Sequence, residues 1–186
     1  MRDVDVVIPV YDGYEETVAC LESVLASVDF SWARPVVVND ASPDPRITAW
    51  LRELATLEQR LVLLENSSNQ GFVKTANRGM SHDAARDVLL LNSDVEVAGN
   101  WLERLREAAY VNESVGSLTP FSNNATLCSF PNICKENRLL FGLDCGDIDE
   151  RFATLFDARD IVDLPTGIGF CMYVRRDCLD KVGLFD

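Results

Sequence analysis

The chain has 186 residues, 47% of them hydrophobic, and its 30 acidic against 17 basic residues give a formal net charge of −13. This length and apolar content predict one folded domain with a sizeable core and exclude a disordered chain. The acidity argues against a wide surface for nucleic-acid phosphates. One or two phosphates could still be held by a metal ion, backbone N–H groups or a single lysine.

The first two-thirds of the chain alternates between strand and helix patterns. Short aliphatic runs, typical of strands buried on both faces, occupy residues 4–10, 35–39, 61–65, 87–91 and 115–120. Between and after them, amphipathic segments predict helices at residues 15–28, 45–57, 72–80 and 101–110, the last with Asn100 as its N-cap. Four strand–helix units in succession predict a parallel, doubly wound α/β sheet.

The remainder of the chain is less regular. Residues 121–159 are rich in Asn, Pro, Gly and Asp, and we expect them to form a long excursion over one face of the sheet. Regular structure is expected again at 161–164, in a strand at 169–175 and in a short helix at 177–182. The chain stops at Asp186 just after two large apolar residues. A short tail packed on the core would explain this ending, but we expect a piece of a longer protein.

The cysteines and the hydropathy pattern bear on the redox state of the thiols and on the cellular location of the protein. None of the six cysteines forms a C-x-x-C pair, and the single His82 is not close in sequence to a cysteine pair, so we expect free, reduced thiols. No apolar stretch is long enough for a membrane span, and the first residues lack a signal-peptide pattern. A cytoplasmic location is the default expectation.

Polar residues follow four of the predicted strands directly. The strand ends carry Tyr11 with Asp12, then Asn39 with Asp40, then the run 66–71, and finally Asn92-Ser93-Asp94. Open α/β sheets bind ligands outside the carboxyl ends of their strands, so these residues predict a site at one edge. An acidic edge of this kind suits a divalent cation that bridges phosphate oxygens.

Chemistry suggests a role for several of these side chains. Asp40 could accept the imide N–H of uracil or thymine, and Tyr11 could lie along a base or ribose. Gly71 would let the backbone approach a ligand, and Lys74 could meet a phosphate. The alternatives are that Asp40 caps the next helix, that Asn69 and Gly71 only form a turn, and that Lys74 is a solvated charge. Their common position at one edge favours the site.

Other nucleotide-binding and catalytic patterns are missing. The segment after the first strand has no G-x-G-x-x-G, and the chain has no Walker A lysine motif. A Ser–His–Asp arrangement around the single His82 has no support.

The ordered motifs resemble glycosyltransferase family 2, whose members are inverting enzymes with a GT-A fold. The resemblance is carried by residues 6–11, 36–44, 69–79, 90–94, 122–126 and 167–176 and so covers nearly the whole chain. It implies one GT-A domain over residues 1–186, with a doubly wound, mostly parallel sheet that is truncated at the C-terminus. Residues 1–120 would be its nucleotide-binding half and residues 121–186 a partial acceptor-side half.

The resemblance also implies roles for individual residues. Asp94 would be the metal-binding acid of a D-x-D motif for Mn²⁺ or Mg²⁺, with Asn92 in place of the first acid, as in a rhamnosyltransferase-like subgroup. We do not expect Glu96 to contribute. Gly167 and Gly169 would lie beside the transferred sugar and the acceptor. The nucleotide would be bound by Pro9, Val10, Tyr11, Asp40, Asn69, Gly71, Lys74, Asn92 and Ser93.

The resemblance implies that the general base lies beyond Asp186, so that no catalytic residue is present and these 186 residues alone are expected to be inactive. The expected reaction is metal-assisted transfer of a hexose, with inversion, from a UDP-, dTDP- or GDP-sugar to a glycan or lipid-linked hydroxyl acceptor. The expected setting is bacterial polysaccharide assembly, in the cytoplasm or peripherally at the inner membrane face. A non-catalytic nucleotide-sugar-binding module and an unrelated nucleotide-binding domain, such as a nucleotidyltransferase, are the alternatives.

Overall fold

The computed structural model describes residues 1–138, 142–155, 157 and 159–186. One mixed sheet forms its centre, with the strand order β3-β2-β1-β4-β6-β5. The strands are β1 (Val4–Val10), β2 (Ala33–Asn39), β3 (Val62–Glu65), β4 (Asp87–Leu91), β5 (Ser117–Leu118) and β6 (Cys171–Val174). The helices are α1 (Tyr14–Ser27), α2 (Pro45–Leu57), α3 (Phe72–Met80), α4 (Trp101–Ala109), α5 (Cys145–Leu155) and α6 (Arg176–Val182), with a 3₁₀ turn η1 (Thr126–Cys128).

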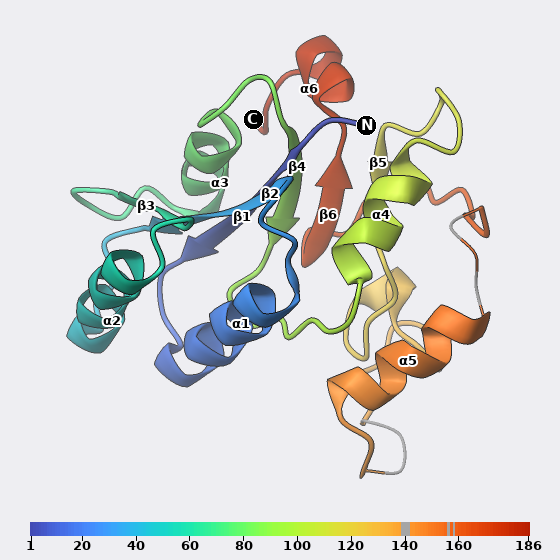
Figure 1. Cartoon of the computed structure of the whole chain (residues 1–186), viewed down its shortest axis with the longest axis horizontal. Coiled ribbons are helices and arrows are strands. Elements are labelled where there is room, and N and C mark those ends of the chain that lie inside the picture. Colours follow the sequence, from blue (N-terminus) through green and yellow to red (C-terminus); the bar gives the residue numbers. More distant parts are fainter. Residues whose placement is uncertain (139–141, 156, 158) are drawn as a thin grey trace.

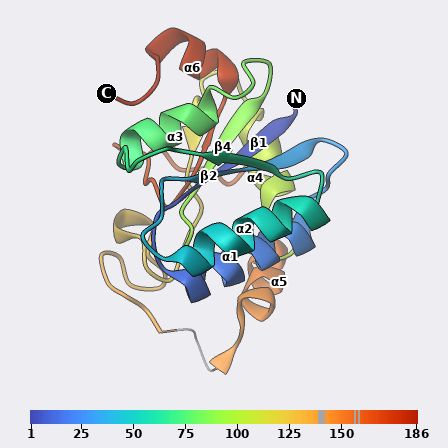
Figure 2. The same ribbon diagram turned by 90° about the vertical axis from the view of Figure 1, so that its left-hand side faces the viewer.

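Helices cover both faces of the sheet. One core cluster joins the sheet to α1, α2 and α4, and a second joins it to α3 and α6. The side view shows α3 and α6 above the sheet and α1 and α2 below it (Figure 2). All five residues of β4 are buried, which is why the four that follow Asp87 are apolar without alternation. The α/β doubly wound prediction is therefore confirmed.

The first four strands are parallel, whereas the last two are not. β1 pairs in parallel with β2 and β4, and β2 with β3, as predicted. β6 pairs antiparallel with β4, with Leu91 opposite Cys171, and β5 is antiparallel to β6. Because of this direction, the residues just before β6 lie beside the residues just after β4 (Figure 1). The second half of the chain thereby reaches the carboxyl edge of the parallel strands.

Three local predictions were wrong in whole or in part. Residues 161–164 form neither helix nor strand, and Val162 is 82% exposed. The excursion contains a helix that was not predicted, α5, which packs beside α4 through an ion pair between Asp149 and Arg104 (Figure 1). Asn100 occupies the predicted N-cap position of α4, but its side chain makes no capping hydrogen bond and instead accepts one from the Arg104 guanidinium.

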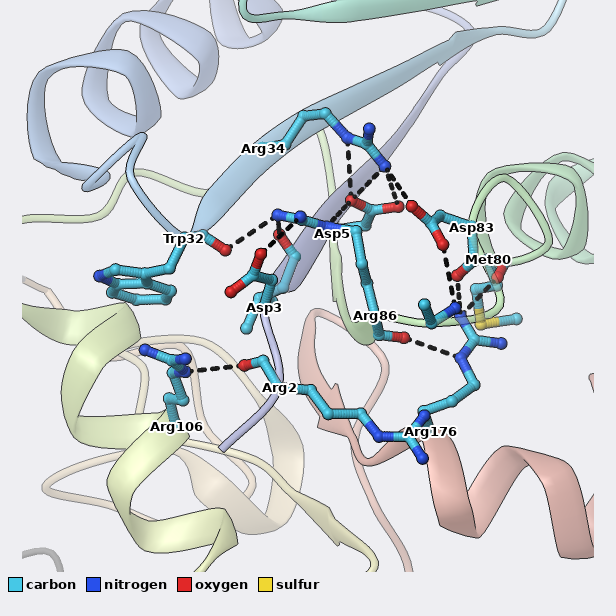
Figure 3. Close-up of polar contacts among 12 residues, drawn as sticks. Arg2, Asp3, Asp5, Trp32, Arg34, Met80, Asp83, Arg86, Arg106 and Arg176 are labelled. Carbon is cyan, nitrogen blue, oxygen red and sulfur yellow. Dashed lines mark hydrogen bonds and ion pairs between the residues drawn. The ribbon is translucent and has the colours of Figure 1, made fainter.

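The opposite, amino-terminal edge of the sheet carries an arginine network. The buried Asp5 carboxylate lies 2.9 Å from Arg34 Nη2 and 2.8 Å from Arg86 Nε, although the Arg86 N–H is not aligned for a hydrogen bond. Figure 3 shows both guanidinium groups converging on Asp5. Nearby, Arg176 donates to the carbonyl oxygens of Arg86, Met80 and Asp83. This edge is closed by the protein's own side chains.

Two further predictions concern cysteines and membrane helices. All six cysteines are free thiols. Within the described residues, no helix has the length and hydropathy needed to cross a membrane.

Candidate functional site

Backbone hydrogen bonds continue between the strands beyond their carboxyl ends. Asp40 N donates to Val10 O at 2.8 Å, and Asn66 N donates to Asn39 O at 2.8 Å. The residues that follow β1, β2 and β3 are therefore neighbours at one edge. Tyr11, the first residue after β1, is 44% exposed there, whereas the Val10 side chain belongs to the core. Pro9 and Val10 could thus meet a ligand mainly through their backbone.

Asp40 is buried at this edge and organises the loop after β3. Its Oδ1 accepts hydrogen bonds from Asn66 Nδ2 at 2.6 Å and Gln70 N at 2.8 Å, and its Oδ2 accepts one from Gly71 N at 2.9 Å. Burial acts to raise the pKa of Asp40, but the hydrogen bonds, from Asn66 first, hold this pKa below its ordinary value. The capping alternative is excluded, because Asp44 accepts from Arg46 N and caps α2.

Gly71 begins α3 in a conformation that favours glycine. Its φ is +79°, and a Cβ at this position would meet no atom within 4 Å, so the backbone angle creates the requirement. Asn69 Oδ1 accepts a second hydrogen bond from the Gly71 N–H at 2.8 Å. Asn69 and Gly71 therefore do form the turn that the alternative interpretation expected. The space around Gly71 nevertheless stays open to solvent.

A hollow of about 560 Å³ lies between this loop and α3. Lys74 lines it and is exposed. Arg78 also lines it and donates to Glu65 O at 2.7 Å and to the Asn66 side-chain oxygen. Sequence reasoning placed Asn66 in the run after the third strand without giving it a role, and it overlooked Arg78. A polar residue directly after a strand and a cation one turn beyond Lys74 were the available signals.

Asn92-Ser93-Asp94 forms a turn directly after β4. Asn92 N donates to Phe170 O at 2.8 Å, Ser93 is half-buried and Asp94 is exposed. Among the described residues, no three His, Cys, Asp or Glu side chains are close enough to form a metal site by themselves. Asp94 and the Asn92 amide oxygen are hard donors that fit Mg²⁺ or Mn²⁺, and phosphate oxygens and water would complete the coordination.

The segment before β6 reaches the same edge. Ile168 N donates to Thr119 Oγ1 at 3.0 Å, and Phe170 forms the hydrogen bond to Asn92 already described. A Cβ at Gly167 would lie 2.8 Å from Met172 Sδ, whereas a Cβ at Gly169 would meet nothing within 4 Å. Gly167 therefore permits close packing, and Gly169 leaves room beside Asn92.

The structure thus brings the predicted site residues to one edge from both halves of the chain. Neutral donors and a buried carboxylate lie near β2 and β3, cations lie on α3, and an exposed carboxylate follows β4. This arrangement could bind a molecule that has a flat hydrogen-bonding group and a phosphate chain.

Comparison with protein families gives a match over most of the chain. The model described as glycosyl transferase family 2 matches residues 5–183. No curated protein matches the chain at the level of sequence.

Solved structures resemble the chain at low sequence identity. The mannosyltransferase PcManGT from Pyrobaculum calidifontis, in complex with GDP-Man and Mn²⁺, has a TM-score of 0.69 at 19% identity, over 100% of this chain and 48% of its own. TarS 1–349 from S. aureus has a TM-score of 0.65 at 18% identity, over 100% and 50%. GalNAc-T7 with UDP, GalNAc and Mn²⁺ has a TM-score of 0.67 at 16% identity, over 99% and 36%. These likenesses establish the fold, and the chain spans about half the length of the first two structures.

Proposed function

The chain belongs to glycosyl transferase family 2, and on this premise we propose that it binds a nucleoside-diphosphate sugar for transfer to a hydroxyl acceptor. The observation that carries the proposal is the carboxyl edge of the sheet. There the buried Asp40, after β2, holds the loop beside Lys74, and the exposed Asp94 follows β4, on the other side of β1. These are the donors and charges that a base, a diphosphate and a divalent cation require.

The nucleoside would lie across the ends of β1 and β2. Asp40 accepts three hydrogen bonds from the loop after β3, and Thr75 is a fourth partner, so its roughly four lone-pair sites are in use. An N–H of the base would therefore take the place of one of these donors. Tyr11 is exposed enough to lie along the base or ribose. Asn69 and the open side of Gly71 would border the nucleotide, and Lys74 would pair with phosphate oxygens.

The diphosphate would lie toward β4. Asp94, with Asn92 as a weaker ligand and Ser93 between them, would hold Mn²⁺ or Mg²⁺. A bound cation would neutralise charge on the departing diphosphate. Gly169 would leave space for the sugar and the acceptor, and Gly167 would let the same segment pack closely on Met172 beside them.

The acceptor side of the proposal rests on the family resemblance. We propose hexose transfer with inversion to a glycan or lipid-linked hydroxyl, in bacterial polysaccharide assembly at or near the cytoplasmic side of a membrane. Inversion needs a general base that deprotonates the attacking hydroxyl. The resemblance leads us to expect that base outside residues 1–186, so donor binding is the first activity to measure.

Calorimetric titration with UDP, dTDP and GDP, each with and without Mn²⁺, tests the proposal. We expect at least one nucleotide to bind, and Mn²⁺ to tighten its binding. Asp94→Asn should remove most of the effect of Mn²⁺ and leave metal-free binding in place. Glu96→Gln, two residues further along the same exposed segment, is the matched control and should bind like the wild type. If none of the three nucleotides binds in the presence of Mn²⁺, the proposal is wrong.

A nucleotide-sugar-binding module without transferase activity would give the same titration. Asn92, in the place of an acid, favours this second candidate, because one carboxylate fewer faces the cation. Mass spectrometry of candidate acceptors incubated with the preferred nucleotide sugar separates the two. A sugar added to an acceptor supports the transferase, and binding without transfer supports the module.

A further inference from the structure

A row of small polar side chains on α1 faces the chain between β4 and α4. Cys20, Ser23 and Ser27 are spaced three and four residues apart, so they lie along one side of the helix. The connection that carries Asp94 runs beside this helix (Figure 1). The row therefore lies next to the segment from Asn92 to Trp101.

Each member of the row binds a successive part of that segment. The Cys20 thiol donates to Asn92 O at 3.5 Å, and the same oxygen accepts from Val95 N at 3.4 Å. Ser23 Oγ accepts from Val97 N at 3.1 Å. Ser27 Oγ accepts from Trp101 Nε1 at 2.9 Å. Side chains at three successive positions along α1 thus bind this segment.

Cys20 is the member of this row that binds the turn carrying Asp94. It is fully buried, and its thiol binds Asn92 O, the oxygen that accepts from Val95 N and so closes the turn over Ser93 and Asp94. On the other flank, Asn92 N is held by Phe170 O. Asp94 itself is exposed, so the direction of its carboxylate depends on the backbone that these contacts hold.

We propose that Cys20 is a positioning residue that, with Ser23, holds the Asn92–Val97 backbone so that Asp94 presents its carboxylate to a divalent cation. The cation part of this inference rests on the proposed function, whereas the ordering of the turn does not. Cys20 touches neither cation nor nucleotide and acts through the backbone.

Four variants separate this role from simple packing. Cys20→Ala removes the sulfur, Cys20→Ser restores a group that can both donate and accept, and Ser23→Ala frees the Val97 N–H. Cys171→Ala is the matched control. Cys171 is another buried thiol, on β6, and no hydrogen bond from its sulfur is found within the described residues.

Hydrogen exchange on the ligand-free proteins gives the first readout. We expect Cys20→Ala to free Asn92 O on the helix side, loosen the turn closed by the Val95 N–H to Asn92 O hydrogen bond, and speed exchange of the Val95 amide about tenfold. Ser23→Ala removes the acceptor of Val97 N and should speed exchange of the Val97 amide by a similar factor. Cys20→Ser should stay within about threefold of the wild type, and Cys171→Ala should leave both amides unchanged. Unchanged exchange at Val95 in Cys20→Ala overturns the proposal, whether or not any nucleotide binds.

Affinity for the preferred nucleotide with Mn²⁺ gives the second readout. Cys20→Ala should lose about tenfold in affinity with Mn²⁺ and less than twofold without it, since the metal-independent contacts lie on other loops. If Cys171→Ala loses as much as Cys20→Ala, the role of Cys20 is packing and the proposal fails. If wild-type protein binds no nucleotide at all, the proposed function fails, while the exchange rates still decide whether Cys20 holds the turn.

Discussion

At the scale of single residues, Asp40 combines a structural role with a proposed recognition role. Its three accepted hydrogen bonds hold the loop from Asn66 to Gly71. We expect Asp40→Asn to lower the free energy of unfolding at pH 7 by about 1–3 kcal/mol, because an amide nitrogen replaces one acceptor and faces backbone donors. Urea unfolding of both proteins measures this difference. Asp12→Asn, an exposed acid after β1, is the control.

The pH dependence of this difference has a definite sign. The pKa of Asp40 in the folded protein is lowered, against about 3.9 in an unfolded chain. The stabilisation by the carboxylate is therefore present above about pH 4 and is lost as the pH falls through the folded pKa. The stability gap between wild type and Asp40→Asn should narrow below about pH 4. A gap that widens there would contradict this assignment.

The sequence could predict which residues lie at the carboxyl edge of the sheet, but not all of the hydrogen bonds that they form there. A polar residue after a buried strand must emerge at the sheet edge, and that rule located Asp40 and Asp94. The hydrogen bonds that Asp40 accepts from Gln70 N and Gly71 N could not be predicted, because they depend on how the loop after β3 folds back over β2. Long-range hydrogen bonds of this kind leave no local pattern.

At the scale of elements, α3 is held unusually close to the sheet at Gly79. A Cβ there would collide with Val7 Cγ1 and lie 3.1 Å from Val38 Cγ2. Gly79→Ala should therefore displace α3 and reduce stability by about 1–3 kcal/mol, despite the higher helix propensity of alanine. Thermal unfolding measures the loss. Gly169→Ala, where the added carbon meets nothing within 4 Å, should unfold close to the wild-type temperature.

Helices and strands were predicted correctly where their burial gives the sequence a clear apolar pattern. β1 to β4 and their helices alternate in regular units, and α2 and α3 begin and end at the predicted residues. The antiparallel direction of β6 is not encoded in its apolar pattern, because both directions bury the same side chains. α5 was overlooked within an Asp-rich segment, although Ile148, Phe152 and Leu155 have the spacing of one helix face and Phe152 packs against Phe121 and Phe130.

At the scale of the whole molecule, the two edges of the sheet differ in what their charges contact. At the amino-terminal edge, Asp5 is paired with Arg34 and Arg86 (Figure 3). At the carboxyl edge, Asp94 is exposed to solvent. Charges at the first edge stabilise the fold, whereas at the second edge the buried Asp40 holds a loop and Asp94 stays open to solvent.

Paired substitutions at the two edges test this division. Asp5→Asn removes the buried carboxylate shared by two partly buried guanidinium groups and leaves Arg34 only with Asp83 and Arg86 only with Asp3, and we expect a loss of about 2 kcal/mol or more in unfolding free energy. Its nucleotide affinity with Mn²⁺, measured well below the unfolding temperature, should match the wild type. Asp94→Asn should show the reverse, with stability within about 0.5 kcal/mol of the wild type and weakened Mn²⁺-dependent binding. Equal effects of Asp5→Asn on stability and affinity would mean that the two edges are coupled through β1 and β4.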